Sequence, residues 1–137
     1  MSKTVLIVDD IPFVRQTLSE IFTQADFQVL GEAATGLEGI QQYQKLKPDF
    51  VTMDIVMPEM SGIEATRKIL KLNPHAKIVI ISAMGQEQLV MEAINAGALD
   101  YILKPFTATD VLKTAERVLA TDSPRKKAPG PTQESFG

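Results

Sequence analysis

The hydrophobic residues of this chain follow two alternating patterns along most of its length. Short apolar runs, which are typical of β-strands, are separated by stretches in which apolar residues recur every three or four positions, as in amphipathic helices. The predicted strands are residues 4–8, 27–33, 50–54, 77–82 and 100–104. The predicted helices are residues 12–25, 36–47, 62–72, 86–96 and 107–120.

The strict alternation of strands and helices predicts an α/β fold, a parallel sheet with helices on its faces. The runs at 4–8, 50–54 and 77–82 are apolar on both faces, as buried central strands are. The run at 27–33 contains polar residues and the one at 100–104 is short, so both are predicted as edge strands. Right-handed crossovers then favour a flavodoxin-like, doubly wound (βα)5 fold with strand order 2-1-3-4-5.

Composition narrows the class of protein. The 137 residues fit one domain, placed at residues 1–120, and residues 121–137 form a Pro- and Gly-rich segment predicted to be a disordered tail or linker. The net charge of −3 gives no indication of nucleic-acid binding, and no apolar run is long enough to span a membrane. With no cysteine and no signal peptide, the chain is predicted to be cytoplasmic.

Charged and polar residues follow the predicted strands at the points where they end. Asp9 and Asp10 follow the first strand, and Asp54 ends the third. Ser82 and Lys104 end the fourth and fifth. The carboxyl ends of parallel strands meet at one edge of the sheet, and ligands bind there at the switch point between neighbouring strands. These five side chains are therefore expected to converge.

Three close carboxylates require compensation. At about 5 Å and an effective dielectric near 20, each pair of like charges costs roughly 3 kcal/mol. Lys104 supplies one positive charge, and a hard cation such as Mg²⁺, or alternatively Mn²⁺, would supply more. A cation, a lysine and a hydroxyl together suit phosphoryl transfer, and a carboxylate can itself accept the phosphoryl group. Asp54, on a central strand, is the best candidate for that nucleophile.

Each of these residues also has a simpler explanation when taken alone. The pair Asp9-Asp10 could be a turn or a helix cap, and Ser82 a cap of the following helix. Lys104 could be a solvated strand end. No phosphate-binding glycine loop is present, and the only histidine, His75, lies in a predicted loop and is expected to be solvated. The expected convergence of all these residues favours a phosphoryl site.

Four motifs occur in order, VLIVDD, KPDFVTMDIVMPEMSGIEA, IVIISAMG and AGALDYILKPF. Over residues 3–120 the chain resembles the receiver domain of two-component response regulators, most closely the stand-alone chemotaxis, CheY-like type. The resemblance implies that Asp54 is the phosphorylated residue. It also implies that Asp9, Asp10, Asp54 and the backbone carbonyl of Val56 hold Mg²⁺, with Asp10 the more direct ligand of the acidic pair.

The resemblance assigns the remaining residues as well. Ser82 matches a switch hydroxyl that moves to the phosphoryl group, Tyr101 an aromatic side chain that turns inward with it, and Lys104 the lysine that pairs with the phosphoryl group. The Lys104-Pro105 peptide bond is expected to be cis. Val56 and Met84 flank the site and cannot orient an attacking water, so a long-lived phosphorylated form is expected.

The resemblance implies a signalling switch rather than an enzyme with turnover. A histidine kinase would donate the phosphoryl group, and the surface formed by the last two helices and the last strand would then bind a partner such as the flagellar motor switch. A phosphatase is a further possible partner, and no membrane or nucleic-acid partner is expected. The alternatives are the receiver half of a longer regulator with an output domain after residue 121, or a phosphatase that works through an aspartyl phosphate.

Overall fold

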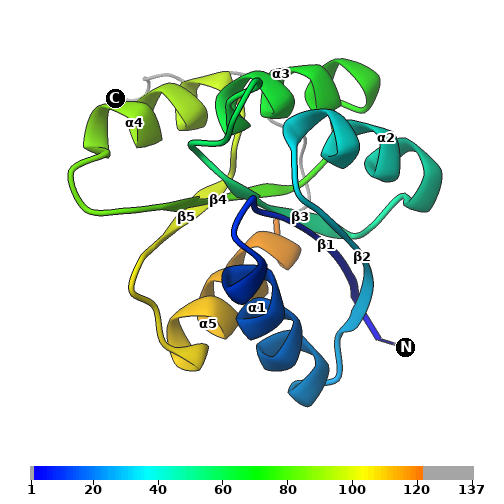
Figure 1. Ribbon diagram of the computed structural model, residues 1–137. Helices are drawn as coiled ribbons and strands as arrows, with labels where there is room; N and C mark the ends of the chain where they lie inside the picture. The colour runs from blue at the N-terminus through cyan, green and yellow to red at the C-terminus, as the bar shows by residue number, and fades with distance from the viewer. Residues whose placement is uncertain (1, 122–137) are drawn as a thin grey trace.

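The computed structural model describes residues 2–121 and arranges them as five strands and five helices in alternation (Figure 1). The strands are β1 (Thr4–Val8), β2 (Gln28–Ala33), β3 (Phe50–Asp54), β4 (Ile78–Ser82) and β5 (Asp100–Leu103). The helices are α1 (Pro12–Gln24), α2 (Gly36–Leu46), α3 (Gly62–Leu72), α4 (Glu87–Ala96) and α5 (Ala108–Leu119). Every element begins and ends within one residue of its predicted bounds. The differences in the helices arise because the predicted ranges included capping residues.

The strands form one parallel sheet in the order β2-β1-β3-β4-β5. The predicted flavodoxin-like fold and its strand order are confirmed. All residues of β3 and β4 are buried, and so are four of the five residues of β1, whereas β2 and β5 are partly exposed. The apolar runs therefore distinguished central from edge strands correctly, since only central strands are covered on both faces.

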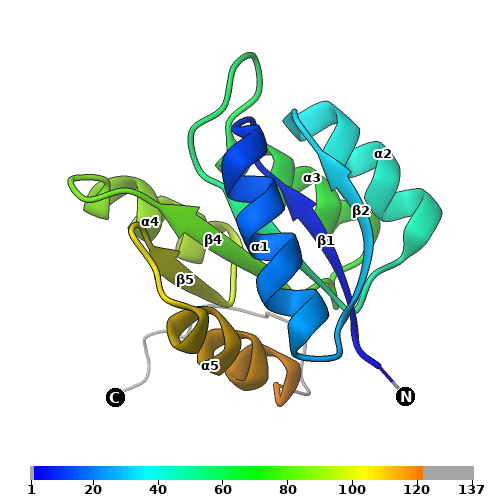
Figure 2. The same ribbon diagram turned by 60° about the horizontal axis from the view of Figure 1, so that its bottom comes forward.

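Helices cover both faces of the sheet. In Figure 1, α2, α3 and α4 lie above the sheet, and α1 and α5 lie below it; the turned view of Figure 2 brings α1 and α5 forward. Successive strand residues point to opposite faces, so β1 contributes to two separate cores. Leu6 and Val8 pack in the core under α2–α4, and Val5 and Ile7 pack in the core with α1 and α5.

Local hydrogen bonds explain where several helices begin. Thr35, Ser61 and Thr107 precede α2, α3 and α5, and each side-chain oxygen accepts from a backbone N–H in the first turn. Helix α1 lacks such a cap and begins instead with Pro12, whose ring favours the first helical position. The loop before α1 is thus free of a capping side chain, and Asp9 and Asp10 lie in that loop.

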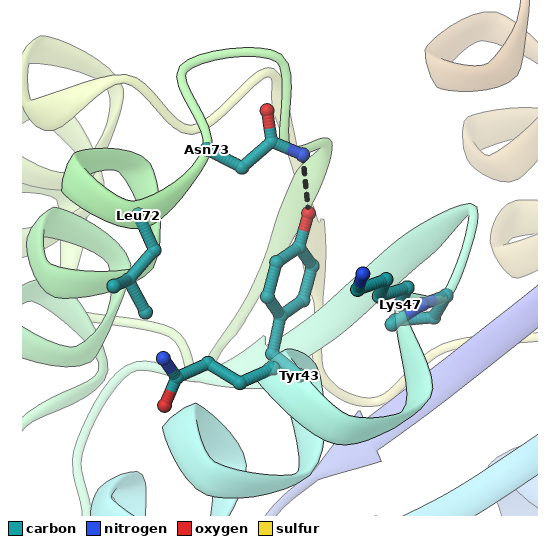
Figure 3. Close-up of a pocket in the computed structure, with 6 residues that line it drawn as sticks. Tyr43, Lys47, Leu72 and Asn73 are labelled. Atoms are coloured by element: carbon teal, nitrogen blue, oxygen red, sulfur yellow. Dashed lines mark hydrogen bonds between the residues drawn. The ribbon is translucent and has the colours of Figure 1, made fainter.

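A cavity of about 460 Å³ lies between the carboxyl ends of α2 and α3 (Figure 3). Tyr43 lines it, and its hydroxyl accepts a hydrogen bond of 2.9 Å from the Asn73 side chain. The cavity is bordered by Pro48, just before β3 begins. It therefore lies at the edge of the sheet opposite to that at which Asp54 ends β3.

The predicted tail at residues 121–137 lies outside the described residues except for Thr121. The division into a domain at 1–120 and a tail accordingly stays a prediction. Within the described part of the chain, no helix combines the length and the apolar character needed to cross a membrane.

Candidate functional site

Three carboxylates gather at the carboxyl edge of the sheet. Asp9 and Asp10 follow β1, Asp54 ends β3, and one oxygen of each lies within 4.8 Å of the others. The strands β1 and β3 are direct neighbours, which is why residues far apart in the sequence meet here. Asp9 and Asp54 are buried and Asp10 is half-buried, so the cluster opens to solvent on the side of Asp10.

Lys104 places a positive charge between two of the acids. Its ammonium nitrogen lies 3.5 Å from Asp9 Oδ2 and 3.7 Å from Asp54 Oδ1. The backbone N–H of Lys104 donates to the Ser82 carbonyl at 2.7 Å, which fixes the lysine beside the end of β4. The Lys104-Pro105 peptide bond is cis. One ammonium group does not neutralise three carboxylates, so the cluster retains an excess of negative charge.

The environment changes the protonation of the two buried acids. Burial, followed by the negative charge of Asp9, raises the pKa of Asp54 from 3.8 to about 7, although Lys104 opposes the rise. Burial also raises the pKa of Asp9, against the hydrogen bond from the Ile11 N–H and the charge of Lys104. Asp54 is therefore protonated more readily in the folded protein than an exposed aspartate would be.

The oxygens of the cluster fit a hard divalent cation. Asp9 Oδ2 is buried and accepts no hydrogen bond from the described residues; its one opposite charge is Lys104. Asp9 Oδ1 is occupied, because it accepts from the Ile11 N–H at 2.9 Å. A buried carboxylate oxygen that accepts no hydrogen bond, within reach of two further carboxylates, is the kind of ligand set that Mg²⁺ prefers.

The loop between β3 and α3 starts directly after Asp54 and closes tightly at its base. The Gly62 N–H donates to the Ile55 carbonyl at 2.9 Å. A Cβ atom at Gly62 would come within 2.1 Å of the Asp54 carbonyl oxygen, so a larger residue would displace the end of β3. Val56 lies in this loop with 51% of its surface exposed. Asp54 is therefore held rigidly while the loop beyond it faces solvent.

Comparison with known proteins identifies the family. The model of the response regulator receiver domain matches residues 5–116. The chain belongs to the response regulator receiver family. The chemotaxis protein CheY of Thermotoga maritima is 52% identical to this receiver over 118 residues, which are 86% of this chain and 98% of that protein. CheY of Listeria monocytogenes is 48% identical over 112 residues, 82% of this chain and 94% of that protein. The predicted CheY-like type is confirmed.

A solved structure agrees with the fold of this receiver. A chain of the CheX-CheY-BeF3-Mg²⁺ complex from Borrelia burgdorferi is 37% identical and superimposes with a TM-score of 0.83. The match covers 87% of this receiver and 90% of that chain.

Ser82 and Tyr101 both line a second cavity in the receiver. The Ser82 hydroxyl is buried at the end of β4 and has no hydrogen-bond partner among the described residues. Tyr101 on β5 is 47% exposed. A cavity of about 270 Å³ is lined by both residues and by Met91 and Leu103. The hydroxyl of Ser82 is therefore free to form a new bond, and there is space beside it for a side chain to enter.

The remaining predicted residue, Met84, lies after β4 with 73% of its surface exposed. The structure thus places the predicted site residues at or just beyond the carboxyl ends of their strands, except Tyr101, which lies within β5 opposite Ile80. It also shows two residues that the sequence reasoning missed, Arg15 on α1 and Glu32 on β2. Arg15 donates a hydrogen bond to the backbone carbonyl of Asp9, and Glu32 accepts one from Arg15. The sequence signal that was available is a basic residue one turn into the helix that follows the acidic pair.

Proposed function

We propose that this receiver is a phosphorylation-activated signalling switch that accepts a phosphoryl group on Asp54. The observation that carries the proposal is the group of three carboxylates within 4.8 Å, with Lys104 paired to Asp9 and Asp54. Such a site concentrates negative charge around one reactive carboxylate and leaves one ammonium group beside it. Phosphoryl transfer requires that combination of a nucleophile with positive charge near the transferred oxygens.

Asp9, Asp10 and Asp54 would hold Mg²⁺ or Mn²⁺, together with the backbone carbonyl of Val56. When bound, the cation neutralises charge on the phosphoryl oxygens. Asp10 is the most accessible of the three carboxylates, which supports its assignment as the more direct ligand of the pair. The Borrelia burgdorferi complex named above contains Mg²⁺, which supports the same choice of metal here.

Asp54 would react as a carboxylate with the phosphohistidine of a kinase. Its oxygen attacks phosphorus, an O–P bond forms, the P–N bond breaks, and the departing imidazole takes a proton from solvent. Lys104 Nζ, 3.7 Å from Asp54 Oδ1, is close enough to pair with the transferred oxygens. The receiver would promote its own phosphorylation and dephosphorylation and would not turn over an external substrate.

Phosphorylation of Asp54 would then change the conformation of the outer surface of the receiver. The unpaired Ser82 hydroxyl would bond the phosphoryl group, and Tyr101 would turn from solvent into the cavity that both residues line. The phosphoryl group adds a charge of about −1.5 to −2, enough to favour one of two existing conformations. The affected surface comprises α4, β5 and α5.

The partners follow from this role. The names of the relatives support a role in chemotaxis. A histidine kinase as donor and a downstream protein such as the flagellar motor switch are part of the proposal. The Borrelia burgdorferi complex contains CheX beside CheY, which supports a further partner protein here. A phosphatase is the class of protein that we propose for it. We further propose that the protein is cytoplasmic. The same proposal places the receiver at residues 1–120 and a separate segment from residue 121 onward.

Incubation with Mg²⁺ and acetyl phosphate, followed by intact mass measurement, tests the proposal. The wild-type chain is expected to gain one phosphoryl group, and Asp54→Asn to gain none. Asp26→Asn is the matched control, because Asp26 is an exposed aspartate just after α1 and is expected to leave the gain intact. Wild-type protein that gains no phosphoryl group with Mg²⁺, or gains it equally without a metal, would show the proposal to be wrong.

A further inference from the structure

The peptide unit that links Asp9 to Asp10 is held through its carbonyl oxygen by a side chain of α1. The Arg15 guanidinium donates from Nη1 to the Asp9 backbone carbonyl at 2.6 Å. The Asp9 N–H donates to the Ala33 carbonyl at 3.0 Å, so both backbone groups of Asp9 are bonded. A peptide unit is planar, and fixing its carbonyl therefore fixes the plane from which the Asp10 backbone continues.

Arg15 is itself held in place. Its Nε lies 3.2 Å from Glu32 Oε1, and Glu32 is on β2, the strand next to the one that delivers Asp9. Only 18% of the Arg15 side chain is exposed, so the guanidinium is largely shielded from water. A charge-assisted hydrogen bond in such a setting is stronger than one between neutral groups. The contact therefore restrains the loop that carries the acidic pair.

We infer that Arg15 is a positioning residue for the metal site and that Glu32 acts through it. Arg15 bonds the backbone of Asp9 and leaves the carboxylate oxygens of the acidic pair to the cation. Without Arg15 the Asp9-Asp10 peptide would keep only the local bonds to the Asp9 N–H and the Asp9 side chain, so part of its ordering would have to occur when the cation binds. This inference rests on the proposed function, because it concerns the same site.

The test measures the Mg²⁺ dissociation constant by titration calorimetry on metal-free protein. Arg15→Gln is expected to raise it about tenfold, the lower end of the effect of losing a residue that supports metal ligands. Arg15→Lys is expected to recover part of the loss, since an ammonium group reaches the carbonyl but lacks the planar fork that also reaches Glu32. Glu32→Gln is expected to give a smaller increase.

A double variant separates positioning from general destabilisation. If Glu32 acts through Arg15, the Arg15→Gln/Glu32→Gln variant should bind Mg²⁺ as weakly as Arg15→Gln alone. The matched control is Arg117→Gln, because Arg117 on α5 pairs with Asp100 on the edge strand β5 at 3.1 Å, far along the sheet from β1. It is expected to leave the Mg²⁺ dissociation constant unchanged.

The outcomes are distinct. An unchanged dissociation constant in folded Arg15→Gln or Glu32→Gln, whatever their melting temperatures, would overturn the inference while leaving the proposed function intact. An equal loss in Arg117→Gln would overturn it as well, since the effect would not be specific to the acidic loop. Wild-type protein that binds no Mg²⁺ would overturn the proposed function and the inference together.

Discussion

Lys104 reaches past the end of strand β4 to Asp54, with its ammonium nitrogen 3.7 Å from Asp54 Oδ1. The same nitrogen lies 3.5 Å from Asp9 Oδ2. One cation therefore serves two buried carboxylates, and it lies where the oxygens of a phosphoryl group on Asp54 would need a positive charge. Removing that charge should affect the reaction more than it affects the fold.

Lys104→Met is expected to slow phosphorylation by acetyl phosphate about tenfold or more, because a preorganised donor to the transferred oxygens is lost. The rate is followed by intact mass against time at saturating Mg²⁺. Lys45→Met, which removes an exposed ammonium group on α2, is the control and should leave the rate unchanged. A Lys104→Met rate within twofold of wild type would contradict the assigned role.

Mg²⁺ is expected to stabilise the folded receiver, because the unfolded chain does not bring the three acids together. At a concentration about 100 times the dissociation constant, binding contributes about 2.7 kcal/mol, which raises the melting temperature by about 5–10 °C. Thermal denaturation with Mg²⁺ and with EDTA measures the shift. Asp10→Asn should lose most of it, and an undiminished shift in that variant would remove Asp10 from the ligands.

Asp54→Asn is expected to stabilise the metal-free protein increasingly as the pH rises. The folded-state pKa of Asp54, about 7, exceeds its ordinary value of 3.8, so folding binds a proton between these values. In the wild type, the contribution of this proton to folding stability is fully present below about pH 4 and is lost as the pH rises through 7. The total loss is roughly 2–4 kcal/mol, and Asp54→Asn does not suffer it. Urea denaturation in EDTA from pH 5 to 8 should show the gap between variant and wild type widening, and a constant gap would refute the raised pKa.

Val56→Asn is expected to shorten the life of the phosphorylated form. Val56 is exposed beside Asp54 and offers no hydrogen bond, whereas an amide could orient an attacking water. One such bond, worth about 1 kcal/mol in the transition state, corresponds to about a fivefold faster loss of the phosphoryl group. The loss is timed by mass after the donor is removed. Val56→Ala, which adds no polar group, should be close to wild type, and an equal acceleration in both would argue against water orientation.

Phosphorylation is expected to move Tyr101 only when Ser82 retains its hydroxyl. The chain has two tyrosines and no tryptophan, so Tyr43→Phe leaves Tyr101 as the single source of tyrosine fluorescence. In that background the emission should change on phosphorylation, and Ser82→Ala should remove at least half of the change. Thr17→Ala, which removes a hydroxyl bonded within α1, is the control. A fluorescence change in phosphorylated Ser82→Ala as large as in the Tyr43→Phe background alone would show that Tyr101 moves independently of the Ser82 hydroxyl.

The fold could be predicted closely from the sequence because burial leaves a direct pattern. The runs that end at Val8, Asp54 and Ser82 are apolar on both faces, and this identified the central strands and hence the edge of the sheet where the acids meet. The convergence of the acids followed from topology alone. The pattern could not predict how deeply the acids are buried, because the full burial of Asp9 depends on packing from several elements.

The contacts of Arg15 show why other parts of the site could not be predicted. Its partner at Asp9 is a backbone carbonyl, and every residue has one, so no residue type marks the contact. The outward position of Tyr101 was equally hidden, since strand alternation assigns a face but not a side-chain conformation. Sequence reasoning thus predicted which acids and which lysine converge, and missed the arginine that bonds the backbone of Asp9.

The close packing of Gly62 against the end of β3 separates two properties of the receiver that could otherwise change together. Asp54 is anchored on one side of the Ile55–Gly62 hydrogen bond, and the exposed loop with Val56 lies on the other. Substitutions in the loop therefore need not disturb the acceptor. If Asp54 accepts the phosphoryl group as proposed, changes in this loop could alter the lifetime of the phosphorylated form and leave the position of the accepting carboxylate unchanged.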